Sequence, residues 1–90
     1  MKHVVYILYS HKKDRYYIGS TSDEISERLR RHNSNHKGFT GGVGDWQLCY
    51  HEEFETITEA RYREKQFKNW KSRLRIEELI RKSSMDLESR

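Results

Sequence analysis

The sequence contains no proline and a single cysteine, Cys49, among its 90 residues. One thiol cannot form a disulfide within the chain, and a zinc site built from several cysteines is excluded as well. No apolar run approaches the roughly 20 residues that a membrane-spanning helix needs, and the N-terminus lacks the pattern of a secretory signal. We therefore expect a cytoplasmic protein that does not contact membranes.

Apolar residues are scarce too, at 33% of the chain against 36% charged residues. This balance is typical of disordered chains, but aromatic residues make up 12%, and disordered chains are poor in aromatics. Together with the Ile, Leu and Val residues, these aromatics suffice for one small hydrophobic core. We predict one domain over residues 1–82, followed by a polar tail over residues 83–90 that frays.

The net charge of +4 is unevenly distributed. Residues 28–37 and 61–82 are rich in Lys and Arg, whereas glutamates are concentrated between them, within residues 52–59. Two basic segments suit a polyanionic partner, because each phosphate contact releases counterions. Solvated helix faces have a similar composition, so charge alone does not decide the function.

Two segments near the N-terminus are predicted to form a β-hairpin. Residues 4–9 and 16–21 are rich in β-branched and aromatic side chains, which is typical of strands, and the polar residues 11–15 lie between them. Both segments are apolar on both faces near their centres. This pattern indicates a sheet that helices cover on each side.

A first helix and a third strand follow this hairpin. Ser22 or Asp23 can cap a helix that continues to about residue 33, with acidic residues in its first turn. The segment 33–45 contains four glycines and is predicted to be a loop. Residues 46–54 alternate between apolar and polar side chains, as a strand does.

Two helices complete the predicted fold. Thr56 or Thr58 precedes a helical pattern that runs to about residue 71, and Ser72 is the predicted cap of a last helix. The order is therefore β-β-α-β-α-α. We predict a small α/β fold in which helices flank a three-stranded antiparallel sheet.

Two tyrosines are the first candidate site residues. If the hairpin pairs as expected, Tyr6 and Tyr17 project from the same face of the sheet. Gly19 would leave a bare patch beside them, where a ligand could approach the backbone. The alternative is that both rings are ordinary strand aromatics packed against a helix.

Arg28 and His32 are the next candidates. They stand four residues apart on the first predicted helix, so they share one of its faces. A guanidinium there could hold a phosphate, and an imidazole could take part in proton transfer. A solvated basic helix with an uninvolved histidine is the alternative.

Glu64 lies within the apolar stripe of its predicted helix, between Ala60 and Phe67. Burying a carboxylate costs several kcal/mol unless it is paired or binds a cation. One carboxylate, completed by water and substrate phosphates, is sufficient for Mg²⁺. The alternative is a helical ion pair with Lys68, which stabilises a helix by only about 0.3–0.5 kcal/mol.

These residues together resemble a known family. The segments Val4-Val5-Tyr6 and Tyr17-Ile18-Gly19, the spacing Arg28-x-x-x-His32 and the glutamate Glu64 are similar to the motifs of the GIY-YIG nuclease superfamily. The resemblance covers about residues 2 to 80 and is greatest to the small stand-alone bacterial members. It implies a β-sheet flanked by helices, with a phosphodiester cleavage site on one face.

The resemblance also implies roles for the candidate residues. Tyr6 or Tyr17 would help to deprotonate the attacking water, Arg28 would stabilise charge on the phosphate, and His32 would receive a proton. Glu64 would bind one Mg²⁺ or Mn²⁺ ion in a one-step hydrolysis. The expected nucleic-acid-binding residues are Arg31, Lys37, Lys68, Lys71 and Arg73.

The chain departs from the family pattern at three places. Val4-Val5 stands where the first motif has Gly-Ile, and the interval from Tyr17 to Arg28 is about one residue longer than in better-known members. Ser20-Thr21 stands where some relatives have a lysine near the phosphate.

The most direct interpretation is a divalent-metal-dependent endonuclease that cleaves DNA in a structure-specific or weakly sequence-specific way. The first alternative is a non-catalytic nucleic-acid-binding module with the same fold. The second is a protein-interaction domain with an exposed patch of Phe39, Trp46 and Trp70. RNA as substrate, a homodimer, a separate targeting protein, and roles in repair, mobile elements or defence stay open.

Overall fold

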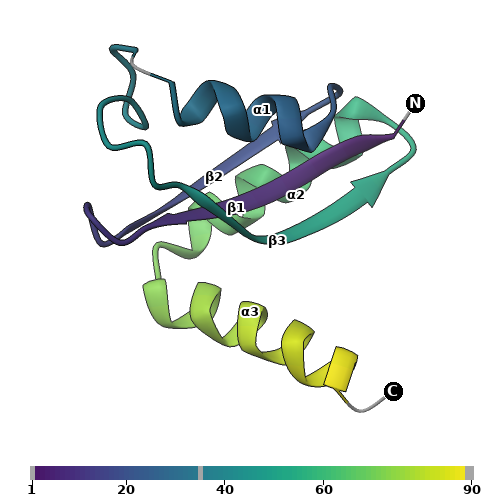
Figure 1. The fold of residues 1–90 in the computed structure, drawn as a ribbon. Helices are drawn as coiled ribbons and strands as arrows, with labels where there is room; N and C mark the ends of the chain where they lie inside the picture. Colours follow the sequence, from purple (N-terminus) through teal and green to yellow (C-terminus); the bar gives the residue numbers. More distant parts are fainter. Residues whose placement is uncertain (1, 35, 89–90) are drawn as a thin grey trace.

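The computed structural model describes residues 2–34 and 36–88 of the chain. The described elements are β1 (His3–Ser10), β2 (Arg15–Thr21), α1 (Ile25–His32), β3 (Gln47–Phe54), α2 (Ile57–Trp70) and α3 (Arg73–Glu88) (Figure 1). Their order, β-β-α-β-α-α, confirms the predicted fold class. None of these helices is both long and apolar enough to cross a membrane.

The sheet is antiparallel, and β1 is its central strand in the order β2-β1-β3. Tyr6 lies opposite Gly19 on β2 and opposite His51 on β3. The five residues from Val4 to Leu8 are all buried, because β1 is covered on both faces. Both neighbouring strands lie at sheet edges and are more exposed.

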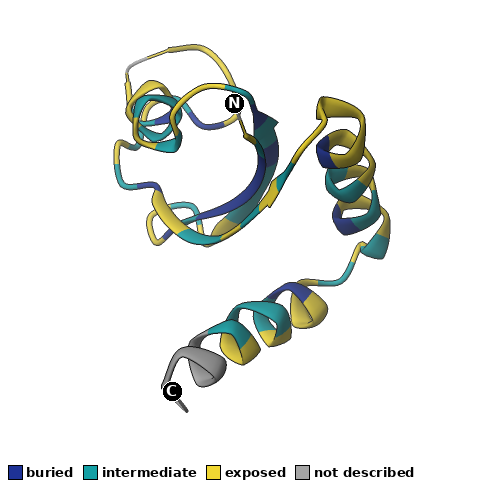
Figure 2. Cartoon of the chain, turned by 90° about the vertical axis from the view of Figure 1, so that its right-hand side faces the viewer, coloured by how far each residue is buried: buried dark blue, intermediate teal, exposed yellow. Residues whose placement is uncertain are grey.

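One face of the sheet packs against α2 and α3. Val5 and Ile7 of β1 form a buried cluster there with Ala60, Phe67 and Ile76. These side chains share a face because alternate residues of a strand point in opposite directions. Figure 2 shows the buried stripe of α2 turned toward the sheet, with α1 on the other side.

The opposite face packs against α1 and the loop that follows it. Tyr6 and Leu8 form a second buried cluster there with Trp46, and Ile25 and Leu29 of α1 pack against it. The prediction of a sheet covered on both sides is therefore confirmed. Since Trp46 is only 2% exposed, it belongs to the core and not to an exposed interaction patch.

The start of α1 differs from the prediction. Neither Ser22 nor Asp23 caps the helix, because its first residue is Ile25 and Glu24 takes the capping position without a side-chain hydrogen bond. The Thr21 hydroxyl instead accepts a hydrogen bond from the backbone N–H of Asp23 at 3.0 Å. This contact forms a turn just before the helix and leaves the first turn of α1 without a side-chain cap.

The caps of α2 and α3 follow the sequence more closely. The Thr56 hydroxyl accepts the backbone N–H of Glu59 and donates to its carboxylate, so Thr56 and not Thr58 is the cap. Lys71 adopts a left-handed conformation with φ of 47° and ends α2. Ser72 then accepts the backbone N–H of Arg75 at 3.3 Å, as predicted for the cap of α3.

The predicted tail over residues 83–90 is helical where its backbone is described. Helix α3 continues to Glu88, because no proline or glycine interrupts the chain after Arg73. Residues 89–90 lie outside the described residues. Fraying of this tail in solution stays a prediction.

Candidate active site

The centre of the candidate site is a buried pair of side chains, Tyr6 and His32. Tyr6 is 2% exposed and His32 is 8% exposed. The Tyr6 hydroxyl lies 2.9 Å from Nε2 of His32, which is hydrogen-bonding distance. The pair forms because β1 directs Tyr6 toward α1, and His32 lies in the last turn of that helix.

Tyr17 lies beside this pair at the surface. Its ring centroid is 6.4 Å from that of Tyr6 and 4.7 Å from that of His32. Tyr6 and Tyr17 thus share one face of the sheet, as the hairpin register predicted. Because Tyr17 is only partly buried, its ring faces both the core and solvent.

Gly19 is required by the position of Tyr6. A Cβ atom at residue 19 would lie 2.6 Å from the Tyr6 hydroxyl oxygen and 2.7 Å from its ring carbon Cζ. The bare patch expected at this glycine is therefore filled by the tyrosine itself. A ligand does not find free backbone there, and Gly19 serves the site by seating Tyr6.

We expect Gly19→Ala to displace the Tyr6 ring and to destabilise the domain by about 1–3 kcal/mol, as overpacked cores do. Thermal unfolding monitored by circular dichroism measures the loss. An unchanged melting temperature would contradict this close approach. Cleavage assays on the same protein then report how strongly activity depends on the position of the Tyr6 ring.

Arg28 lies next to the Tyr6 hydroxyl. This polar contact raises the pKa of the Arg28 guanidinium above its ordinary value, so the side chain keeps its charge. Its Nε atom is buried and has no hydrogen-bond partner among the described residues. A buried N–H without a partner is costly, and an anion beside it would satisfy it.

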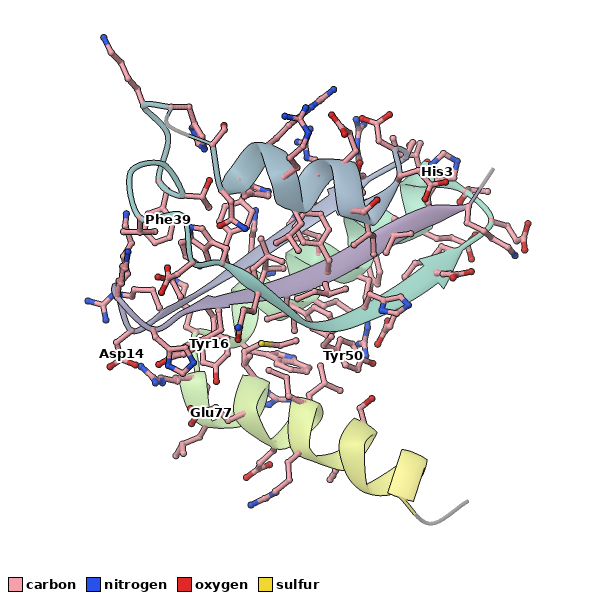
Figure 3. All side chains as sticks on the ribbon, viewed as in Figure 1. His3, Asp14, Tyr16, Phe39, Tyr50 and Glu77 are labelled. Carbon is pink, nitrogen blue, oxygen red and sulfur yellow. The ribbon has the colours of Figure 1, made fainter. Side chains whose placement is uncertain are left out.

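An open cavity of about 400 Å³ adjoins Arg28. Its walls come from β2, α1 and the loop after α1, where Phe39 lies beside the end of the helix (Figure 3). The lining residues used below are Tyr17, Arg28, His32, His36, Phe39 and Thr40. A phosphodiester group in this cavity would meet two guanidinium groups, of Arg28 and Arg31, and the imidazole of His32.

The environment of the site shifts two pKa values. Burial lowers the pKa of His32, and the charge of Arg28 lowers it further, so the neutral form of His32 is favoured at pH 7. Burial raises the pKa of Tyr6, while its contact with Arg28 opposes that increase. A neutral imidazole next to a phenol that resists ionisation is the resting state of the site.

Glu64 comes from the other layer of the fold, on α2. Its carboxylate accepts a hydrogen bond from Ser20 at 2.5 Å and from Lys68 at 2.6 Å. The ion pair that the sequence offered as an alternative is thus present. Within the described residues, neither Tyr6 nor Arg28 forms a hydrogen bond or ion pair with this carboxylate.

Glu64 nevertheless lies near the candidate site. Ser20, which donates to it, follows Gly19 on the edge strand β2, and Gly19 touches the Tyr6 hydroxyl. The negative charge of Glu64 contributes to raising the pKa of Tyr6. The carboxylate therefore lies on the α2 side of the edge strand β2, close enough to Tyr6 to act on it electrostatically.

The residues around Glu64 fit one hydrated divalent cation. No group of three or more His, Cys, Asp or Glu side chains is gathered anywhere in the described ranges 2–34 and 36–88. Mg²⁺ is commonly bound by one carboxylate together with water and substrate phosphates. Each Glu64 oxygen has a second lone pair beyond the bond to Ser20 or Lys68, so this donor set is chemically suitable.

The predicted nucleic-acid-binding residues fall into two groups. Arg31 and Lys37 lie near the cavity at α1 and its following loop, and both are exposed. Lys68, Lys71 and Arg73 lie on the α2–α3 side and line a different cavity. The structure does not bring these five side chains onto one face.

Arg73 is already engaged within the protein. It donates to the Asp14 carboxylate at 2.7 Å and to Glu77 at 3.3 Å, and it lies over the ring of Tyr16. Figure 3 shows Asp14, Tyr16 and Glu77 gathered where the β1–β2 loop meets the start of α3. Arg73 thus ties this loop to α3, whereas Lys71 is exposed and has no such role.

Sequence reasoning assigned no role to two further residues. Thr40 is 2% exposed and lies 2.8 Å from Nδ1 of His32, on the side opposite Tyr6. Ser20 holds the Glu64 carboxylate. The loop and strand patterns gave no signal for either contact, because both depend on how distant segments pack.

The chain was compared with known proteins. The family model described as the GIY-YIG catalytic domain matches residues 2–77. The solution NMR structure of a UPF0213 protein from Bacillus halodurans is 33% identical, with a TM-score of 0.56, over 89% of this chain and 83% of that chain. No curated protein matches the chain significantly.

Proposed function

The chain belongs to the GIY-YIG family, and from this premise we propose that it is a divalent-metal-dependent endonuclease that hydrolyses phosphodiester bonds in DNA. The observation that carries the proposal is that Tyr17, Arg28 and His32 line one open cavity, while the buried Tyr6 hydroxyl lies within hydrogen-bonding distance of His32. These side chains come from β1, β2 and α1. Such a gathering of a phenol, an imidazole and a guanidinium suits phosphoryl chemistry.

Arg28 has the clearest role in this reaction. Its guanidinium is charged, adjoins the cavity and carries a buried N–H without a partner in the described residues. A phosphodiester group in the cavity would lie beside the positive charge of this guanidinium. The same charge would stabilise the additional negative charge that develops on phosphorus in the transition state.

Tyr6 is the residue that activates water. A phenol removes a proton from water only when it is ionised, and burial makes ionisation of Tyr6 harder. Arg28 opposes that effect. Tyr17 forms the outer wall of the cavity and positions the substrate beside the Tyr6 ring.

Glu64 binds the cation. Bound Mg²⁺ or Mn²⁺ supplies Lewis-acid stabilisation of the phosphate and the leaving oxygen. The protein contributes the Glu64 carboxylate, which Ser20 of the edge strand β2 holds in place. Lys68 must share this carboxylate or release it when the cation binds.

The exposed basic residues favour a nucleic acid as substrate. Arg31 and Lys37 near the cavity, Lys68 on α2 and Lys71 just after it are exposed to phosphates on either side of the sheet. So small a surface suits structure-specific or weakly sequence-specific cleavage. Cleavage of both strands would require a homodimer or two successive nicks, and a targeting protein could direct the enzyme within the cytoplasm.

One observation favours a second candidate function, a non-catalytic nucleic-acid-binding module. Glu64 is paired with Lys68 and forms no hydrogen bond with either tyrosine in the described part of the chain. A domain that only binds DNA would tolerate that arrangement, because it needs no cation. Activity in the presence of metal separates the two functions.

The test is a metal titration against linear, flapped and branched DNA and a matched RNA. We expect cleavage that begins only when Mg²⁺ or Mn²⁺ is added and stops when EDTA is added. Branched or flapped DNA is expected to be cleaved faster than linear duplex. Binding without metal-stimulated cleavage of any of these substrates would establish the binding module instead.

A further inference from the structure

The Tyr6–His32 pair is the inner end of a longer chain of hydrogen bonds. On its other ring nitrogen, Nδ1, His32 lies 2.8 Å from the Thr40 hydroxyl. That hydroxyl lies 3.1 Å from Nε2 of His36, and Nδ1 of His36 accepts the backbone N–H of Gly38 at 3.0 Å. The series thus contains four side chains, from the buried Tyr6 to the exposed His36, and ends at the backbone amide of Gly38.

The backbone amide of Gly38 fixes the donor and the acceptor in each hydrogen bond of this series. An amide N–H can only donate, so Nδ1 of His36 must accept, and the proton of the neutral ring is on Nε2. Nε2 of His36 therefore donates to the Thr40 oxygen. Thr40 is 2% exposed, and within the described residues the acceptor left for its own proton is Nδ1 of His32.

The same reasoning extends to the buried pair. Because Nδ1 of His32 accepts a proton from Thr40, the single proton of neutral His32 is on Nε2. Nε2 then donates to the Tyr6 hydroxyl oxygen. The proton of that hydroxyl is then directed away from His32, and the Tyr6 oxygen also faces the guanidinium of Arg28, which can only donate.

Hydrogen bonds to the core anchor the loop that carries Thr40 and so hold its hydroxyl beside His32. The indole N–H of Trp46 donates to the Thr40 carbonyl at 2.8 Å. Asn33 in turn holds the backbone of Trp46 at both its N–H and its carbonyl. Thr40 is therefore fixed by a buried core residue, and its hydroxyl is directed at the histidine by the fold.

We propose that Thr40 and His36 are positioning residues that hold His32 as a hydrogen-bond donor to Tyr6. His32 then stabilises the ionised phenol together with Arg28 and does not act as its base. This inference rests on the proposed function for its effect on catalysis, but not for the protonation state of His32. It departs from the role that the sequence resemblance implied for His32, which was to receive a proton.

Nuclear magnetic resonance of the free protein, labelled with ¹⁵N at its histidine side chains, tests the protonation state. Long-range ¹H–¹⁵N correlations distinguish a ring protonated on Nε2 from one protonated on Nδ1. We expect the Nε2 form for His32 at neutral pH. A ring protonated on Nδ1 would overturn the proposal, because Tyr6 would then be donating to His32.

Two substitutions test the dependence on Thr40. Thr40→Val has nearly the same shape but no hydroxyl, so we expect the spectrum of His32 to become a mixture of both forms. Thr40→Ser restores the hydroxyl and is expected to restore the Nε2 form. A Thr40→Val protein with an unchanged His32 spectrum would contradict a positioning role for this residue.

Kinetics of the metal-loaded enzyme give the second readout. Loss of one hydrogen bond is expected to lower kcat about fivefold to tenfold in Thr40→Val, with KM within about twofold. His36→Ala should produce a smaller decrease in kcat, whereas His11→Ala, at an exposed histidine of the β1–β2 loop, should produce none. If the wild type has the Nε2 form but cleaves nothing, the proposed function fails and the assigned protonation state stands.

Discussion

Replacement of Glu64 by glutamine is expected to lower metal-dependent cleavage about a thousandfold, while DNA binding persists. Glutamine keeps the shape of the side chain and can still accept the hydrogen bond from Ser20. It loses the negative charge that a divalent cation requires. Metal-stimulated cleavage and DNA affinity, measured on the same protein preparation, separate the loss of chemistry from the loss of binding.

The structure limits what else this substitution can change. Glu64 is only partly buried, and its pairing with Lys68 stabilises a helix by about 0.3–0.5 kcal/mol, so the domain should remain folded. Glu78→Gln on α3 is a matched control, because Glu78 is exposed and lies outside the site. Full activity of Glu64→Gln would show that any required metal is bound elsewhere.

Tyr6→Phe is expected to lower the rate of cleavage about 10²- to 10⁴-fold, the range of a lost general base. The substitution removes a single oxygen from a ring that is 2% exposed, so packing is preserved. It also removes the acceptor of the His32 hydrogen bond, which costs about 1 kcal/mol of stability. Single-turnover rates together with thermal unfolding measure both effects.

The pH dependence of the rate identifies the phenol as the base. Burial raises the pKa of Tyr6 above its usual value of about 10, so the reactive ionised form is a minor species at pH 7. Its population increases about tenfold per pH unit below that pKa. We expect the wild-type rate to increase in this way between about pH 7 and 9, and the increase to be absent in Tyr6→Phe.

A matched tyrosine provides the control for this experiment. Tyr62 on α2 is 65% exposed and lies outside the cavity that Arg28 adjoins, so Tyr62→Phe should keep the wild-type rate and pH profile. Equal rates for the wild type and Tyr6→Phe would remove Tyr6 from the mechanism. Such a result would favour Tyr17, the other phenol of the site.

Local sequence patterns were sufficient to predict the strands and helices and the positions of Tyr6, Tyr17, Arg28 and His32 on their own elements. The β-branched and aromatic run of β1 and the shared face of Tyr6 and Tyr17 follow from strand geometry, in which side chains alternate. Arg28 and His32 are four residues apart on one helix, so their common face is also a local property. The helical pair needs only the period of one element, whereas the shared face of the tyrosines also needs the pairing of β1 with β2.

Helix boundaries were less predictable, because several residues compete for the same role. Thr56 and Thr58 are both good caps in sequence, and only the path of the chain from β3 selects Thr56. At α1 the choice between Ser22 and Asp23 was wrong, since Thr21 forms the turn and the helix begins at Ile25. Cap choice depends on how the preceding segment enters the helix.

By itself, the sequence determined the order of strands and helices, the two covered faces of the sheet and the four side chains that β1, β2 and α1 present on one side. Only the tertiary structure decided that Ser20 of the edge strand β2 holds the Glu64 carboxylate, and that the Thr40 hydroxyl lies beside Nδ1 of His32. The reason is physical. Periodicity within an element sets which face a side chain occupies, whereas contacts between a helix and an edge strand, or between a loop and a helix end, depend on packing across long sequence separations.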